Sequence, residues 1–333
     1  MLSRHADAIY WLGRYMERAE CTARMVDVHY HYRLERSVLA EETLWSGILA
    51  ISGEEQRFLA QYGPELAEDE RSILQFFCFE SRNPSSILTS LAQARENARS
   101  IREQISTEMW ECVNRAYLEL SGTDLDKVMR RSPYTLFQAV KNHSHLLQGI
   151  SERTLMEGEG RDFYNLGRFV ERASQTTRVL DVKYHVLLPR FRDGQNPGEP
   201  SPLPEPDSVG GPVDVHGWIA VLRSVGGLEA FRKTHPAVAD PTTIAGFILL
   251  NDRFPASVRY CANAAQRRIE RLTQSTGIRQ DNRARFASFQ LCGRLASVRI
   301  EEVVKEGLHE FLKDQHDRFD ELALLIAETF LQY

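Results

Sequence analysis

The chain has 333 residues, of which 42% are hydrophobic and 26% charged, and its formal net charge is -5. These values are typical of a globular protein that is large enough to bury a sizeable core. The acidic balance argues against nucleic acid as a main partner, because phosphate binding relies on an excess of Lys and Arg. No apolar run approaches the roughly 18 residues of a membrane-spanning helix, so we expect no membrane partner.

The N-terminal segment and the cysteines both indicate a cytoplasmic location. Charged side chains interrupt the N-terminal stretch MLSRHADAIYWLGRYMER, where a signal peptide would need a continuous apolar region. The five cysteines are widely spaced and form no C-x-x-C pair. We therefore expect reduced thiols, with neither disulfides nor a zinc site.

The first predicted element is a long helix over residues 10–34, and its pattern returns at residues 164–188. The two segments, YWLGRYMERAECTARMVDVHYHYRL and YNLGRFVERASQTTRVLDVKYHVLL, are identical at 14 of 25 positions and are offset by 154 residues. Neither contains Pro, and apolar side chains recur in the first at helical spacing. Because neither helix covers its own apolar stripe, we expect the two to pack on each other or on the long helix of their own half.

The remainder of the first half has further helical patterns. A short apolar helix is predicted over residues 41–52, and Asp69 is predicted to cap the next one. A single long helix is then expected over residues 85–120. Strand signals are nearly absent along the whole chain.

The second half repeats this order. Trp218 corresponds to Trp45 at a shift of 173 residues, and Asp240 corresponds to Asp69 at a shift of 171. The change from a shift of 154 to one of 173 locates an insertion, and residues 189–212 are rich in Pro and Gly, as an extended loop would be.

These patterns predict an all-α fold. We expect an internally duplicated helical bundle, with two pseudo-symmetric halves packed through their long helices. The first helical repeat would span residues 1–150, and the second would span residues 151–333 with its insertion at 189–212.

Polar side chains repeat in register beside the apolar stripe of both long helices. Residues seven apart on a helix lie almost on one line. One such line holds Tyr10, Glu17, Arg24 and His31 in the first copy, and Tyr164, Glu171, Arg178 and His185 in the second. Further repeated cations are Arg14, Arg18, Arg168 and Arg172. A solvated face has no physical reason to keep these types in register, so we expect a strip that is buried or faces a ligand.

Glu17 and Glu171 are the candidate catalytic residues, and the other members of the strip are candidates for binding a substrate or partner. If the two helices meet near a twofold axis, the carboxylates would lie close together among the arginines. A carboxylate in that setting could act as acid or base, or the arginines could clamp a carboxylate or phosphate. An interhelical ion-pair network that fixes the docking of the halves would explain the same residues.

No metal site or cofactor is predicted. The chain lacks the loop motifs of nucleotide-binding proteins, the serine-hydrolase elbow and the H-E-x-x-H of zinc peptidases. Asp27 with His31, and Asp181 with His185, lie one helical turn apart and could ligate a metal. An Asp that holds a His in one tautomer explains the spacing more simply.

Four segments, in this order along the chain, resemble the alpha-E family, a bacterial all-helical domain of unknown function: LSRHADAIYWLGRYMERAE, QARENARSIREQISTEMWE, LGRFVERASQTTRVLDVKYH and KEGLHEFL. The family's characteristic residues fall here on Gly13, Arg14, Glu17, Arg18, Gly167, Arg168, Glu171, Arg172, His309 and Glu310. The resemblance implies an association with circularly permuted ATP-grasp proteins and with transglutaminase-like peptidases. ATP-grasp enzymes join a carboxylate to an amine through an acyl phosphate.

From this resemblance we expect a cytoplasmic helical partner of an ATP-grasp system that makes or modifies peptide-like amide bonds. The chain would be non-catalytic or co-catalytic, and would bind the ligase or a carboxylate-bearing, peptide-like substrate. Two alternatives stay open from the sequence. The chain could be an enzyme in its own right, with Glu17 or Glu171 as acid/base and an arginine clamp, or a structural pseudo-dimer that the strips only fasten.

Overall fold

The computed structural model describes residues 1–36, 45–187, 212–236 and 240–331. Within these ranges the chain forms sixteen α-helices and no strand, which confirms the predicted all-α fold. The helices are α1 (Ser3–Arg36), α2 (Ser46–Ser52), α3 (Glu55–Tyr62), α4 (Glu70–Cys78), α5 (Ile87–Ser100), α6 (Thr107–Ser121), α7 (Leu125–Arg131), α8 (Pro133–Thr154), α9 (Glu159–Leu187), α10 (Pro212–Ser224), α11 (Leu228–Thr234), α12 (Pro241–Leu250), α13 (Val258–Ser275), α14 (Arg283–Ser297), α15 (Ile300–Glu306) and α16 (Leu308–Ile326). Two short elements complete them, η1 (Pro64–Leu66) and η3 (Ala327–Leu331).

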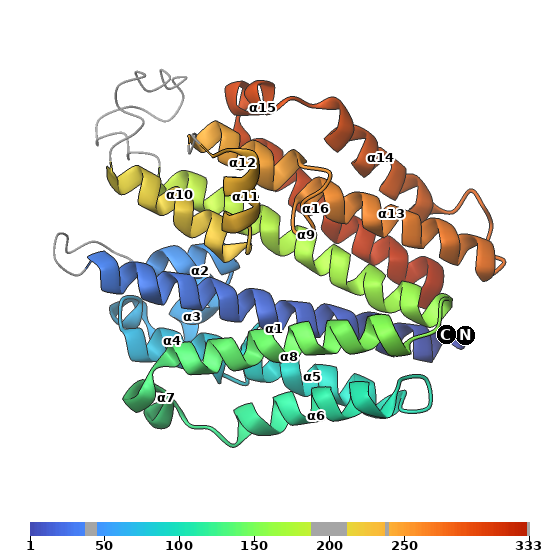
Figure 1. Cartoon of the computed structure of the whole chain (residues 1–333), viewed down its shortest axis with the longest axis horizontal. Helices are drawn as coiled ribbons and strands as arrows, with labels where there is room; N and C mark the ends of the chain where they lie inside the picture. Colours follow the sequence, from blue (N-terminus) through green and yellow to red (C-terminus); the bar gives the residue numbers. More distant parts are fainter. Residues whose placement is uncertain (37–44, 188–211, 237–239, 332–333) are drawn as a thin grey trace.

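Two long helices, α1 and α9, lie side by side at the centre of the molecule. Figure 1 shows most of α2 to α8 on the α1 side of this pair and most of α10 to α16 on the α9 side. We call α1 to α8 the first half and α9 to α16 the second half. α1 is also covered by α5 and α8, and α9 by α13 and α16. The apolar stripes of both long helices are therefore buried from two directions, which stabilises the fold by roughly 25 cal/mol per Å² of apolar surface.

Two glycines let α1 and α9 approach closely. A Cβ atom added at Gly13 would overlap the carbonyl oxygen of Tyr164, and one added at Gly167 would overlap the carbonyl oxygen of Tyr10. The crossing is thus reciprocal, since each helix presents a glycine to the backbone of the other. This close contact brings the polar strips that follow each glycine within reach of each other.

Several helix starts lie where the sequence predicts them. Asp69 accepts a hydrogen bond from the backbone N–H of Ser72 and caps α4, and Asp240 does the same for Thr243 at the start of α12. Trp45 and Trp218, which were matched in the sequence, are both buried. Internal duplication stays an inference from the sequence, and the order of the helices agrees with it.

The prediction of a single helix over residues 85–120 is wrong, because the structure has two helices there, α5 and α6. The chain leaves helical geometry after α5, and Ile101 and Ile105 are buried in the turn that follows. The Ser106 hydroxyl then accepts a hydrogen bond from the N–H of Met109 and starts α6, which packs back on α5. A good N-cap and two buried apolar side chains outweigh the local helical pattern here.

The predicted division into residues 1–150 and 151–333 stays a prediction, and its boundary falls near the end of α8. The predicted insertion at 189–212 lies outside the described residues except for Pro212, which begins α10. Among the described residues, no helix has the length and apolar character needed to cross a membrane.

The glycine crossing yields a stability prediction. Gly13→Ala and Gly167→Ala force the two backbones apart, and we expect each to lower the free energy of unfolding by about 1–3 kcal/mol or more, measured by urea denaturation. Gly149→Ala in α8 is the matched control, because a Cβ there meets nothing within 4 Å. It should leave stability unchanged or raise it by up to about 1 kcal/mol. Equal effects at all three positions would contradict the close crossing.

Candidate functional site

Glu171 of α9 is held by two arginines of α1. Its Oε2 atom accepts a hydrogen bond from Arg14 Nε at 2.9 Å. Arg18 binds both carboxylate oxygens, with its Nε atom 2.6 Å from Oε1 and its Nη2 atom 3.0 Å from Oε2. Gln175, one turn further along α9, donates to Oε1 at 3.1 Å. The carboxylate is therefore saturated by donors, and its side chain is almost completely buried.

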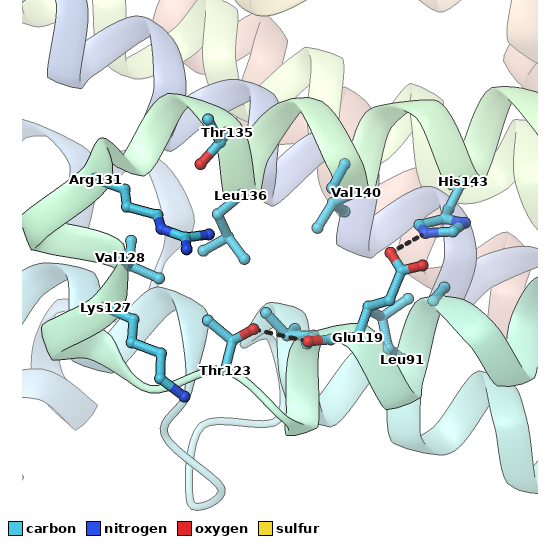
Figure 2. Close-up of a pocket in the computed structure, with 13 residues that line it drawn as sticks. Leu91, Glu119, Thr123, Lys127, Val128, Arg131, Thr135, Leu136, Val140 and His143 are labelled. Carbon is cyan, nitrogen blue, oxygen red and sulfur yellow. Dashed lines mark hydrogen bonds and ion pairs between the residues drawn. The ribbon is translucent and has the colours of Figure 1, made fainter.

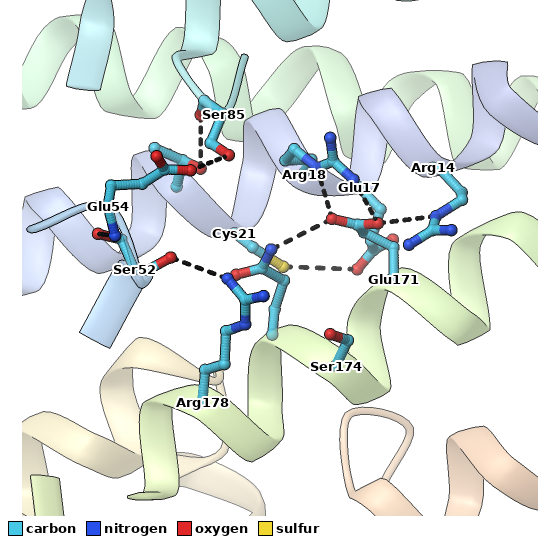
Figure 3. A network of polar contacts seen from close by, with 12 residues as sticks. Arg14, Glu17, Arg18, Cys21, Ser52, Glu54, Ser85, Glu171, Ser174 and Arg178 are labelled. Atoms are coloured by element: carbon cyan, nitrogen blue, oxygen red, sulfur yellow. Dashed lines mark hydrogen bonds and ion pairs between the residues drawn. The ribbon is translucent and has the colours of Figure 1, made fainter. Parts of the chain in front are cut away.

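Glu17 of α1 is held in the same way by two arginines of α9. Arg172 binds it with two parallel hydrogen bonds, Nε to Oε1 at 2.5 Å and Nη2 to Oε2 at 2.7 Å. Arg168 Nε lies 3.7 Å from Oε2. Figure 3 shows Arg14, Arg18 and Glu171 converging between the two helices, with Glu17 nearby. Each helix therefore gives its glutamate to the arginines of the other.

We call these six side chains the reciprocal cluster: Arg14, Glu17, Arg18, Arg168, Glu171 and Arg172. Two tyrosines flank it, because the guanidinium of Arg14 lies 5.8 Å from the ring centre of Tyr10 and that of Arg168 lies 5.6 Å from the ring centre of Tyr164. Both tyrosines are buried. The structure thus brings eight of the twelve predicted site residues together.

The electrostatics of the cluster keep Glu171 ionised. Burial by itself opposes ionisation, but the charges and hydrogen bonds of Arg18 and Arg14 outweigh it and hold the pKa of Glu171 well below its usual value. The pKa of Arg172 is raised above its usual value, since Glu17 outweighs the effect of burial. Burial raises the pKa of Tyr164 to about 12, so this hydroxyl stays protonated.

This geometry favours a structural role for the two glutamates. A general acid or base needs an accessible carboxyl group that gains and loses a proton near the working pH. Glu17 and Glu171 are 3% and 1% exposed, and each carboxylate is enclosed by two arginines of the other helix. Of the alternatives that the sequence left open, the geometry favours the ion-pair network that docks the halves.

Arg24 and Arg178, the next members of the predicted lines, also reach across to the other half. Arg24 of α1 lies against Gly226 after α10, and Arg178 of α9 lies against Gly53 after α2. Arg178 Nη1 donates to the carbonyl oxygen of Ser52 at 2.8 Å, which Figure 3 also shows. Both arginines therefore pack against a turn of the opposite half, and Arg178 also binds its turn through a hydrogen bond.

The last members of the lines lie elsewhere. His31 bonds to the backbone and carboxylate of Asp27 within α1 and contacts the ring of Tyr134, so it is not part of the cluster. The side chain of His185 lies outside the described residues. Asp27 binds Lys141 Nζ at 2.6 Å, and Asp181 binds His309 at 2.7 Å. Among the described residues no group of three or more acidic, His or Cys side chains is arranged to hold a metal ion.

Sequence reasoning missed the histidines that meet Arg24 and Arg178. His145 of α8 bonds to Glu20 at 3.1 Å and contacts Arg24, while His316 of α16 bonds to Arg178 at 3.0 Å. These two histidines are 171 residues apart, the same shift that relates Asp69 to Asp240. That shift was the signal that could have identified them.

A cleft opens beside the reciprocal cluster, between the two halves. We call it the interhalf cleft; its volume is about 440 Å³. Its polar lining comes from Glu17, Glu20, Cys21, Arg24, His145, Gln148, Arg172 and Gln175, and its apolar lining from Met25, Val179, Val225, Phe254, Pro255 and Ala256. Helices α1 and α8 therefore supply one side, while α9 and two turns of the second half supply the other.

The charged groups at this cleft are mostly paired. Burial opposes ionisation of Glu20, yet the hydrogen bond from His145 and the charge of Arg24 lower its pKa well below the usual value. Burial and the charges of Glu17 and Glu20 raise the pKa of the Cys21 thiol well above its usual value. Cys21 is therefore a protonated thiol at neutral pH and is unsuited to act as a nucleophile.

Breaking the reciprocal cluster has a predictable cost. Glu171→Gln leaves Arg14 and Arg18 without their counter-ion, and we expect a loss of about 3–5 kcal/mol in the free energy of unfolding at pH 7. Glu96→Gln is the matched control, since Glu96 forms an exposed ion pair with Arg99, and it should change stability by less than about 1 kcal/mol. Urea denaturation of the two variants measures the difference.

The same comparison has a defined pH dependence. Because the pKa of Glu171 is lower in the folded than in the unfolded chain, the unfolded state binds more protons and stability rises with pH. The contribution is complete above the unfolded pKa of about 4.3 and is lost as the pH falls towards the folded value. The stability difference between the native chain and Glu171→Gln should therefore shrink below about pH 5. A difference that stays constant down to pH 3 would contradict this assignment.

Comparison with known proteins agrees with the sequence resemblance. Residues 1–331 match the Alpha-E family, described as a predicted alpha-helical domain with a conserved ER motif. Two Glu-Arg pairs, Glu17-Arg18 and Glu171-Arg172, lie at the centre of the reciprocal cluster. No curated protein and no solved structure matches the chain. The match spans nearly every residue, so the chain belongs to the Alpha-E family.

Proposed function

We propose that this chain is a cytoplasmic helical partner of an ATP-grasp system that forms or modifies peptide-like amide bonds. Its task is to bind the ligase or a carboxylate-bearing, peptide-like substrate, and the interhalf cleft is the binding site. The link to ATP-grasp proteins rests on the family resemblance. The assignment of a binding role rests on the site itself.

The observation that carries this proposal is the closure of the reciprocal cluster beside an open cleft. Both repeated glutamates are bound by arginines of the other long helix, so the cluster supplies rigidity. The cleft next to it offers donors and acceptors of hydrogen bonds at Gln148 and Gln175, and the guanidinium of Arg24, whose Nη2 atom is bound to Glu20. Such groups suit the amides and carboxylate of a peptide-like chain.

The apolar side of the cleft completes the match. Val179, Val225 and Phe254 belong to the side of the cleft that the second half supplies, and they give a surface for aliphatic parts of the same ligand. Since the lining comes from both halves, an occupant would contact both at once. The rigid crossing of α1 and α9 holds the two walls at a fixed separation, so the ligand meets a preformed site.

A binding measurement with a charge-changing variant tests the proposal. Gln148→Glu adds a negative charge to the cleft without breaking any hydrogen bond of that side chain within the described residues. Gln138→Glu makes the same change on the same helix but outside the cleft lining. We expect the native chain to bind a circularly permuted ATP-grasp protein or its carboxylate substrate, and Gln148→Glu to weaken that affinity by about fivefold through like-charge repulsion. Gln138→Glu should bind as the native chain does.

Two results would contradict the proposal. One is turnover of an amide-forming or amide-hydrolysing reaction by the purified chain alone, which would make it an enzyme. The other is the absence of binding to both the ATP-grasp protein and its substrate in titrations with the correctly folded native chain.

A further inference from the structure

A second pocket lies within the first half, and none of its lining comes from α1 or α9. It is formed by α6, α7, α8 and the turn at Thr123, with one side chain from α5, and its volume is about 230 Å³ (Figure 2). We call it the α6–α8 pocket. Its floor is apolar and consists of Leu91, Ala116, Leu120, Val128, Leu136, Ala139 and Val140. The small side chains of Ala116 and Ala139 leave the space between the helices open.

Two cations stand at one end of this pocket. Figure 2 shows the guanidinium of Arg131 directed towards the pocket beside Leu136, while the side chain of Lys127 runs along the edge of the pocket and ends below Thr123 in this view. Arg131 has no ion-pair or hydrogen-bond partner within the described part of the chain. Lys127 lies 3.5 Å from Asp124, in a pair whose two side chains are more than half exposed. Such an exposed pair is weak, so both cations remain available to an anion.

The opposite end holds a carboxylate that is already occupied. Glu119 Oε2 lies 2.7 Å from His143 Nε2, and Figure 2 shows this pair at the far end of the pocket from Arg131. The carboxylate of Glu119 is therefore held by His143 at the end of the pocket away from Arg131. The pocket combines an apolar floor with one positive end.

We propose that the α6–α8 pocket binds a small monocarboxylate with a short aliphatic chain. The chain lies on the apolar floor, and the carboxylate accepts hydrogen bonds from the guanidinium of Arg131. A cavity of about 150 Å³ holds benzene, so a pocket of about 230 Å³ has room for a chain of roughly eight carbons. This proposal is independent of the function assigned to the interhalf cleft, since the two sites share no residue.

Three probes of equal chain length test this proposal: octanoate, octan-1-ol and octylamine, each titrated into the full chain by calorimetry. We expect octanoate to bind at a single saturable site, and the neutral and cationic probes to bind at least about tenfold more weakly, because a charge-assisted hydrogen bond is lost. Arg131→Ala should weaken octanoate binding by about tenfold. Arg130→Ala removes the same charge from the neighbouring exposed position outside the pocket, and should have no effect.

A second variant tests the floor without changing any charge. Ala139→Leu fills part of the pocket, so octanoate binding should be lost while the melting temperature stays close to that of the native chain. Equal affinity for octanoate and octan-1-ol would overturn the proposal, as would equal effects of Arg131→Ala and Arg130→Ala. Unchanged octanoate binding by Ala139→Leu, or no saturable binding by the native chain, would overturn it as well.

Discussion

The exchange of glutamates between α1 and α9 is the interaction on which the rest of the structure depends. Glu171 is bound by Arg14 and Arg18, and Glu17 by Arg168 and Arg172, in a contact from which water is largely excluded. Bringing these charges out of water costs several kcal/mol for each ion, and the cost is offset only when the partners meet in good geometry. Any other register of the two helices would leave buried charges unpaired, so the cluster selects one arrangement of the halves.

The glycine crossing and the charged cluster act together. Gly13 and Gly167 bring the backbones close, and the glutamates four residues after them then lie within reach of the opposite arginines. Two turns further, Arg24 lies against the turn at Gly226, and Arg178 lies against the turn at Gly53. The result is a sequence of contacts along the interface that fixes the walls of the interhalf cleft. A preformed cleft of this kind suits the binding of a ligand that contacts both halves.

The sequence predicted the inward-facing strip but not its pairing. Helical periodicity shows that Tyr10, Glu17 and Arg24 lie on one line along the helix. The repeat of this line in the second long helix indicates that it is buried or faces a ligand. Periodicity says nothing of where two helices cross, so the assignment of Glu171 to the arginines of α1 needed the structure. The repeated Gly13 and Gly167 were the signal for a close crossing. The break before Ser106 was missed because a capping serine within a helical pattern resembles an ordinary surface residue.

The remaining site residues depend on contacts between distant segments. Lys141 forms an ion pair with Asp27, which is 114 residues away in the sequence. Neither the residue type of Lys141 nor its position in α8 predicts that this pair is buried. Likewise the side chain of His145 is largely exposed, yet its Nε2 atom bonds to Glu20 on α1. The α6–α8 pocket is lined by the small side chains of Ala116 and Ala139, and no local pattern in the sequence predicts this space between the helices. Local sequence therefore determined the helices and their buried faces, while the cleft and the pocket follow from packing.

A double-mutant cycle between Arg18 and Glu171 tests the central claim most directly. Arg18→Met, Glu171→Gln and the double variant are compared with the native chain by urea denaturation at pH 7. If the two side chains form a buried pair across α1 and α9, the coupling energy should be about 1.5–3 kcal/mol. Effects that add within about 0.5 kcal/mol would contradict the account, because they would mean that the repeated glutamates and arginines do not hold the halves together.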